Sequence, residues 1–220
     1  PAYLLDHTDL TFELSEGVTE VTAQLSLKRA PGQGAGPLEL VGQDLELLSV
    51  ALDGVALTDN EYRLEGDTLV IPAMPESGVV TVRTRIYPEK NTALEGLYRS
   101  GGMYCTQCEA EGFRRITYSL DRPDVLSRYR TTIRGDGAQL PIMLSNGNEV
   151  SRQILADGRQ EVVWEDPFPK PSYLFALVAG DLQWIEDHFV TASGRTVLLR
   201  IYTEPHNIGQ VDYAMDALKR

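Results

Sequence analysis

The stretch Val18-Thr19-Glu20-Val21-Thr22-Ala23-Gln24-Leu25-Ser26-Leu27 alternates apolar and polar residues almost throughout. Successive side chains of a strand point to opposite faces of a sheet, so a period of two predicts a half-buried strand. Residues 10–14 and 79–87 repeat the pattern, and Pro88 ends the second of these runs. We therefore expect a chain built mainly from short strands.

The breaks between these runs carry residues that favour turns. Asp53-Gly54, Asp136-Gly137 and Asp157-Gly158 predict tight hairpins, because glycine accepts a positive φ. Residues 31–37, rich in glycine and proline, predict a surface loop. Many short strands with almost no helical periodicity predict an antiparallel, mainly β domain, either a sandwich or a curved sheet.

The last third of the chain has a different pattern. Residues 173–180 are apolar throughout and lie between Pro171 and Asp181, which predicts a strand buried on both faces. A second strand is expected over residues 196–202. Beyond Pro205, Val211, Met215 and Leu218 fall at helical spacing. This predicted helix is still amphipathic at Arg220 and has no C-terminal glycine, which suggests that the chain is cut inside a longer protein.

Composition excludes several classes of protein. The 220 residues include 32 acidic and 20 basic side chains, for a formal net charge of −12. Such a charge argues against nucleic acid and against an anionic membrane surface as partners. No apolar run approaches the roughly 20 residues of a spanning helix, and the start has no signal-peptide pattern. With only two cysteines a disulfide scaffold is not expected, and we predict a cytoplasmic protein.

The sequence contains no complete catalytic motif. His7, His188 and His206 are far apart, and no His-Glu-x-x-His zinc motif, G-x-S-x-G elbow or phosphate-binding loop occurs. We therefore predict no catalytic and no metal-binding residue in this chain. Cys105 and Cys108 form a C-x-x-C pair that fits a redox dithiol or half of a zinc site. Since no further cysteine and no βαβ pattern accompany the pair, two small buried thiols are the favoured interpretation.

Three side chains that can accept hydrogen bonds occupy alternate positions from residue 107 to residue 111. Gln107, Glu109 and Glu111 would point the same way if the segment were extended. A carboxylate beside a carboxamide could bind a cation such as a protonated amine. Equally, the segment could be a solvated strand edge, or Glu109 or Glu111 could pair with Arg114 or Arg115.

Several blocks resemble the N-terminal domain of bacterial aminopeptidases of the M1 (gluzincin) family of zinc metallopeptidases. These blocks are residues 91–98 (NTALEGLY), 105–114 (CTQCEAEGFR), 120–125 (LDRPDV), 144–148 (LSNGN), 166–171 (DPFPKP) and 173–181 (YLFALVAGD). They follow the family's order and spacing, and the resemblance extends over nearly the whole chain. It implies a saddle-like antiparallel β-sandwich over residues 1–181, which caps the active site and recognises substrate. Residues 182–220 would be the opening strands and first helix of the thermolysin-like catalytic domain.

The resemblance also implies a function. The parent enzyme would use zinc to remove the N-terminal residue of peptides, and its zinc motif would lie downstream of Arg220. This chain alone would then hold no zinc and be inactive. In the family, the Gln-x-Glu of the matching block helps to hold the substrate's α-amino group, so Gln107 and Glu109 are the expected substrate-binding residues, with Glu111 structural. The partners would be peptides with a free N-terminus and the catalytic domain of the same chain.

Two other classes of function remain as alternatives. A stand-alone β-sandwich that binds peptides would end at a cap near Asp181. A redox protein would depend on Cys105 and Cys108, and their replacement by serine would abolish its activity.

Overall fold

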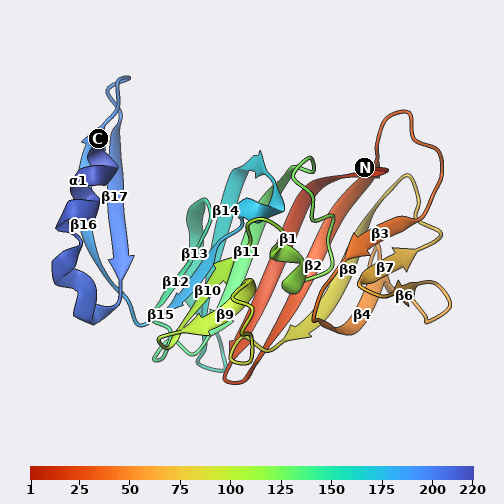
Figure 1. Cartoon of the computed structure of the whole chain (residues 1–220), viewed down its shortest axis with the longest axis horizontal. Coiled ribbons are helices and arrows are strands. Elements are labelled where there is room, and N and C mark those ends of the chain that lie inside the picture. The colour runs from red at the N-terminus through yellow and green to blue at the C-terminus, as the bar shows by residue number, and fades with distance from the viewer.

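An eight-stranded sheet forms the base of the molecule in the computed structural model, which describes all residues from 1 to 220. Its strand order is β13-β14-β11-β1-β2-β8-β4-β5 (Figure 1). The strands are β1 (Tyr3–Ser15), β2 (Val18–Arg29), β4 (Glu46–Leu52), β5 (Val55–Ala56), β8 (Ser77–Ile86), β11 (Ser127–Gly135), β13 (Asn148–Ile154) and β14 (Gln160–Lys170). All neighbouring pairs are antiparallel except β1 and β11, which run parallel with His7 opposite Arg128.

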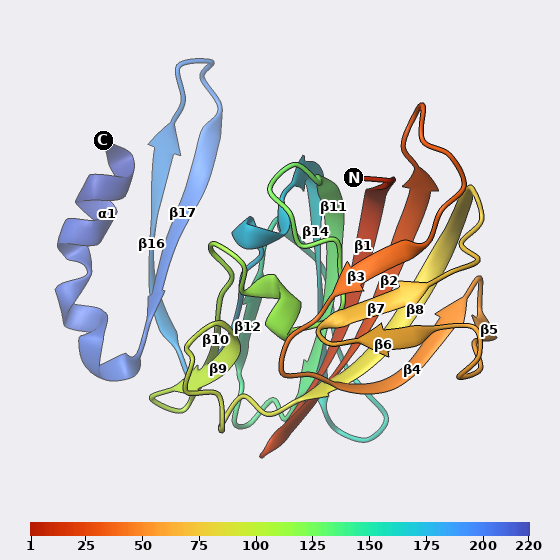
Figure 2. The same ribbon diagram turned by 45° about the vertical axis from the view of Figure 1, so that its right-hand side comes forward.

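Two smaller sheets form a second layer. One has the order β3-β7-β6, with bounds Leu38–Val41, Thr68–Ile71 and Arg63–Glu65, and lies over β2 and β8 in Figure 2. The other has the order β12-β15-β10-β9, with bounds Ile142–Ser145, Leu177–Gly180, Met103–Gln107 and Gly96–Ser100. Two short 3₁₀ helices, η1 (Phe113–Arg115) and η2 (Ser172–Leu174), complete this layer. The mainly β, predominantly antiparallel class predicted from the sequence is confirmed.

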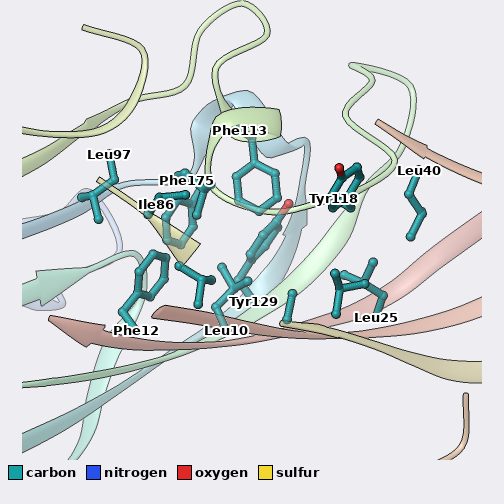
Figure 3. Close-up of a cluster of buried hydrophobic side chains, with 14 of the residues drawn as sticks. Leu10, Phe12, Leu25, Leu40, Ile86, Leu97, Phe113, Tyr118, Tyr129 and Phe175 are labelled. Atoms are coloured by element: carbon teal, nitrogen blue, oxygen red, sulfur yellow. The ribbon is translucent and has the colours of Figure 1, made fainter. Parts of the chain in front are cut away.

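The core lies between the layers and contains 33 buried residues. At its centre Phe12 stacks on Phe175 with ring centroids 5.9 Å apart, and Phe113 meets Phe175 edge-on at 5.4 Å (Figure 3). Tyr129 lies against the same two rings. Since aromatic pairs add about 0.5–1.5 kcal/mol beyond their buried area, this cluster joins η1 and η2 firmly to the large sheet.

The period-two runs fold as predicted. In β2 the residues at alternate positions from Thr19 to Leu27 are buried, as a strand with one inward face requires. β8 ends at Ile86, two residues before Pro88. Asp53-Gly54 joins β4 to β5 and Asp157-Gly158 lies between β13 and β14, so both predicted hairpin turns are confirmed.

Two local predictions are wrong. Asp136-Gly137 does not make a hairpin, because β11 and β12 belong to different sheets. Instead the Asp136 carbonyl accepts hydrogen bonds from the amides of Gln139 and Leu140, at 3.1 and 2.8 Å. The apolar run 173–180 is not one strand either: its first two residues lie in η2, and β15 takes only the last four. The strand begins only at Leu177, because the extended Pro171 is followed first by the 3₁₀ turn of η2.

The C-terminal segment stands beside the two layers in Figure 1 (blue). It comprises the hairpin of β16 (Gln183–Val190) and β17 (Thr196–Thr203), then η3 (Pro205–Gln210) and α1 (Asp212–Lys219). The predicted strand and helix are thus confirmed. An ion pair between Lys219 and Asp187 ties α1 to β16. The 33-residue core includes nothing beyond Ala179, and the domain boundary at Asp181 stays a prediction. No helix of the chain is both long enough and apolar enough to cross a membrane.

Candidate functional site

The hairpin of β9 and β10 places Gln107 at the end of a strand. In this hairpin Met103 is opposite Ser100 and Gln107 is opposite Gly96. The other edge of β10 pairs with β15, so the strand is fixed on both sides. Gln107 is the last residue of β10 and is exposed.

The chain then turns sharply instead of continuing as a strand. The amide of Gly112 donates to the carbonyl of Cys108 at 2.9 Å, which closes a loop over residues 108–112. A Cβ added to Gly112 would lie 2.3 Å from the carbonyl oxygen of Gln107 and 3.0 Å from the amide nitrogen of Gly96. Gly96 itself has a φ of +71°. These two glycines let the loop fold back onto the hairpin, so the segment is not extended through Glu111 and the condition for Gln107, Glu109 and Glu111 to point the same way is not met.

The two predicted substrate-binding residues are brought together by this loop. The Nε2 of Gln107 donates to the main-chain carbonyl of Glu109 at 3.0 Å. The carboxylate of Glu109 is exposed and has no ion pair and no hydrogen bond within the chain. A carboxylate accepts only, and its best partner is a positively charged N–H donor. The arrangement can therefore accept a protonated amine from outside the chain.

Glu111 behaves differently from Glu109. Its carboxylate pairs with Arg114 at 3.1 Å, which confirms the alternative of a local salt bridge for this one residue. Arg114 also donates through Nε to the carboxylate of Asp121 at 2.9 Å. Arg115 pairs with Glu95 at 3.1 Å, and also with Asp44. The arginines after the loop are thus occupied by residues other than Glu109.

Asp121 and Gly112 were missed as parts of the site by reasoning from the sequence. Asp121 lies in a block that carries the family resemblance, but nothing in its spacing shows that it reaches Arg114. Gly112 has a φ of −83°, which any residue adopts, and only the close approach to Gln107 explains the glycine. Both residues belong to the site through tertiary contacts, which the sequence does not reveal.

The cysteines and histidines form no second centre. Cys105 and Cys108 are free thiols, and burial together with the nearby charge of Asp121 raises the pKa of Cys108 to about 12. Burial also raises the pKa of Cys105. A protonated thiol is a poor nucleophile and a poor metal ligand, which argues against the redox and zinc interpretations. No three His, Cys, Asp or Glu side chains are grouped so as to hold a metal ion.

A known protein family matches most of the chain, including the loop that carries Glu109. The family described as the peptidase M1 N-terminal domain matches residues 7–174. The chain belongs to the peptidase M1 family. It is 50% identical to aminopeptidase N of Caulobacter vibrioides over 218 residues, which are 99% of the chain and 25% of that protein. To aminopeptidase N of Escherichia coli it is 48% identical, over 100% of the chain and 25% of that protein.

Solved structures of the M1 family agree with the fold. The structure of Legionella pneumophila aminopeptidase A in complex with aspartic acid matches with a TM-score of 0.92 and 36% identity, over 99% of the chain and 26% of that protein. An M1 zinc metallopeptidase mutant of Deinococcus radiodurans, bound to a Tyr-Ser-Ala substrate, matches with a TM-score of 0.77 at 15% identity, over 93% of the chain and 48% of that protein. At that identity the second match shows the fold alone. The chain spans about a quarter of the length of the aminopeptidases N that it matches.

Proposed function

We propose that this chain is the substrate-recognition part of a zinc aminopeptidase that removes the N-terminal residue of peptides. Its relatives are named aminopeptidase N, the chain covers 25% of the length of each, and the family that matches it is the peptidase M1 N-terminal domain. In this proposal the chain caps the active site of the parent enzyme in the cytoplasm and does not catalyse hydrolysis alone. The observation that carries it is the exposed, unpaired carboxylate of Glu109, a residue whose main-chain carbonyl accepts a hydrogen bond from the side chain of Gln107.

Glu109 and Gln107 would anchor the substrate's α-ammonium group. A charge-assisted hydrogen bond from an ammonium to a fixed carboxylate is among the stronger polar contacts. Because the amine marks the end of a peptide, such an anchor sets the distance from the terminus to the scissile bond. The enzyme would thereby cleave after the first residue only.

The zinc of the parent enzyme would be bound outside this chain. The side chains described above do not fit a zinc site, since no three potential ligands are grouped and the motif His-Glu-x-x-His does not occur. The catalytic domain would be the partner of this chain. The turn between β9 and β10 supports this, since it lies against the C-terminal segment: a Cβ added to Gly101 would lie 2.9 Å from the Oε1 of Glu204.

The test compares two inhibitors of the parent enzyme that differ only in the amine. Alanine hydroxamate has a free α-amino group, and propionohydroxamate lacks it. In the variant Glu109→Gln we expect inhibition by alanine hydroxamate to weaken by about 10- to 100-fold, the worth of a hydrogen bond to a charged group. Inhibition by propionohydroxamate should stay near the wild-type value.

The matched control is Glu65→Gln, which removes an exposed carboxylate of β6 that already has Arg63 as its partner. This control should keep the wild-type preference for the amine. If Glu109→Gln weakened both inhibitors equally, the anchoring role would be refuted. A stop codon directly after the codon for Arg220 would refute the catalytic parent and favour a binding module.

A further inference from the structure

Asp121 is a buried carboxylate that joins two distant turns. Its side chain is 2% exposed. One oxygen, Oδ2, accepts hydrogen bonds from the amide and the Nε of Arg114, at 3.2 and 2.9 Å. The other, Oδ1, accepts from the hydroxyl of Ser172. The Nη2 of Arg114 donates back to the main-chain carbonyl of Asp121 at 3.1 Å. The residue thus fixes η1 against η2.

These hydrogen bonds hold η1, which directly follows the loop that carries Glu109. Arg114 lies in η1, and its neighbour Arg115 donates its amide to the carbonyl of Gly112 at 3.0 Å. Cys108 is buried before the loop, and Phe113 is buried after it. The direction of the Glu109 side chain therefore depends on how these two ends are held, since its carboxylate makes no hydrogen bond and no ion pair within the chain.

Burial of Phe113 alone does not fix that direction. The aromatic contacts of Phe113 hold its ring in the core, but the hydrophobic contribution is not directional and does not set how the exposed residues 109–111 are oriented. The three hydrogen bonds from Arg114 to Asp121 are directional, and two of them are made by a planar guanidinium in a fixed geometry. They constrain η1 where it meets the loop.

We propose that Asp121 is a positioning residue for Glu109, acting through Arg114 and the turn at Gly112. This inference rests on the proposed function, because it assigns Asp121 to the same amine anchor. Asp121 does not touch the substrate, since its carboxylate is buried and already accepts three hydrogen bonds. Its role is to hold the Glu109 carboxylate where the ammonium group arrives.

The test uses Asp121→Asn in the parent enzyme and the two hydroxamates. Asparagine keeps the shape of the side chain but removes its charge and one acceptor. We expect inhibition by alanine hydroxamate to weaken about tenfold, since a misplaced carboxylate loses most of a charge-assisted contact. Inhibition by propionohydroxamate should change by less than about twofold, within the scatter of independent sites. A general loss of structure would weaken both inhibitors together.

The matched control is Asp124→Asn, an exposed carboxylate nearby that pairs with Arg122. It should keep the wild-type ratio of the two inhibition constants. The double variant Glu109→Gln with Asp121→Asn separates the two proposals. If Asp121 acts through Glu109, the double variant should lose no more amine preference than Glu109→Gln alone.

Each outcome has one meaning. A wild-type ratio in Asp121→Asn, or an additive loss in the double variant, overturns the positioning role while the anchor stands. An unchanged ratio in Glu109→Gln overturns the anchor itself. If Asp121→Asn does not fold, Ser172→Ala takes its place, because it removes one hydrogen bond and leaves the pair with Arg114. A smaller loss, about threefold, is then expected, and a wild-type ratio overturns the inference.

Discussion

Replacing Gly112 by alanine should displace the loop that carries Glu109. The new methyl carbon would lie 2.3 Å from the carbonyl oxygen of Gln107 and 3.0 Å from the Cα of Cys108. Both contacts are with backbone, so no side chain can rotate out of the way. To bring the first separation to 3.0 Å the loop must move by about 0.7 Å or more. Because the φ of Gly112 is −83°, the effect is one of space and not of conformation.

The size of the effect follows from this displacement. Overpacking of this kind lowers the free energy of unfolding by about 1–3 kcal/mol. Displacement of a binding group by about 1 Å can lower catalytic efficiency about 100-fold. For a shift of about 0.7 Å we expect kcat/KM of the parent enzyme on an alanyl p-nitroanilide to fall about 10- to 100-fold.

The assay is steady-state hydrolysis, with thermal denaturation measured in parallel to show that the variant is folded. Gly34→Ala is the matched control, because its added Cβ meets nothing within 4 Å and its loop is exposed. This control should have the wild-type kcat/KM. A folded Gly112→Ala variant with wild-type kcat/KM would refute the argument that close packing of the loop places Glu109.

Three further predictions concern the chain itself. Since the pKa of Cys108 is raised to about 12, its thiol should react with iodoacetamide much more slowly than an unfolded thiol at pH 8, and equal rates would contradict its burial. The hydrogen bond from Arg122 lowers the pKa of Asp124 to about 2, so its contribution to stability is present above the unfolded pKa and lost as pH falls through the folded value. The difference in Tm between the wild type and Asp124→Asn, small because the carboxylate is exposed, should accordingly shrink as pH falls below about 4, and a difference that grows on acidification would contradict this sign. Phe113→Ala should lower the free energy of unfolding in urea by about 3–5 kcal/mol, because the ring is fully buried; a loss below about 1 kcal/mol would be inconsistent with the core.

Much of the fold could be predicted from the sequence because strand patterning is local. The alternation in β2, the proline after β8 and the hairpins at Gly54 and Gly158 each depend on a few neighbouring residues. The turn at Asp136 could not be predicted, because an Asp-Gly pair does not reveal that the next strand joins another sheet. The parallel pairing of β1 with β11 is equally invisible in either strand alone.

The family resemblance names candidate residues for the site, whose role stays a prediction, but their geometry could not be predicted. The family resemblance pointed to Gln107 and Glu109, which are both exposed, one at the end of β10 and the other in the loop that follows. The direction in which they point could not be predicted, because the turn depends on contact between Gly96 and Gly112, 16 residues apart in the sequence. The ion pair of Glu111 with Arg114 was one of several open pairings, and only the turn selects it.

The parallel pairing of β1 with β11 governs how this chain can fold as it leaves the ribosome. β1 can pair with β2 as soon as β2 is synthesised, since only two residues separate them. Its other edge stays unpaired until β11 is synthesised, in which Arg128 lies opposite His7. During that interval a central strand of the sheet exposes unpaired amide and carbonyl groups, the feature that promotes association with other chains. Synthesis of roughly 120 residues at about 5–20 per second takes several seconds or more. The order of strands in the sheet therefore creates a period in which β1 can associate with other chains. A chaperone that shields β1 would have most effect during this period.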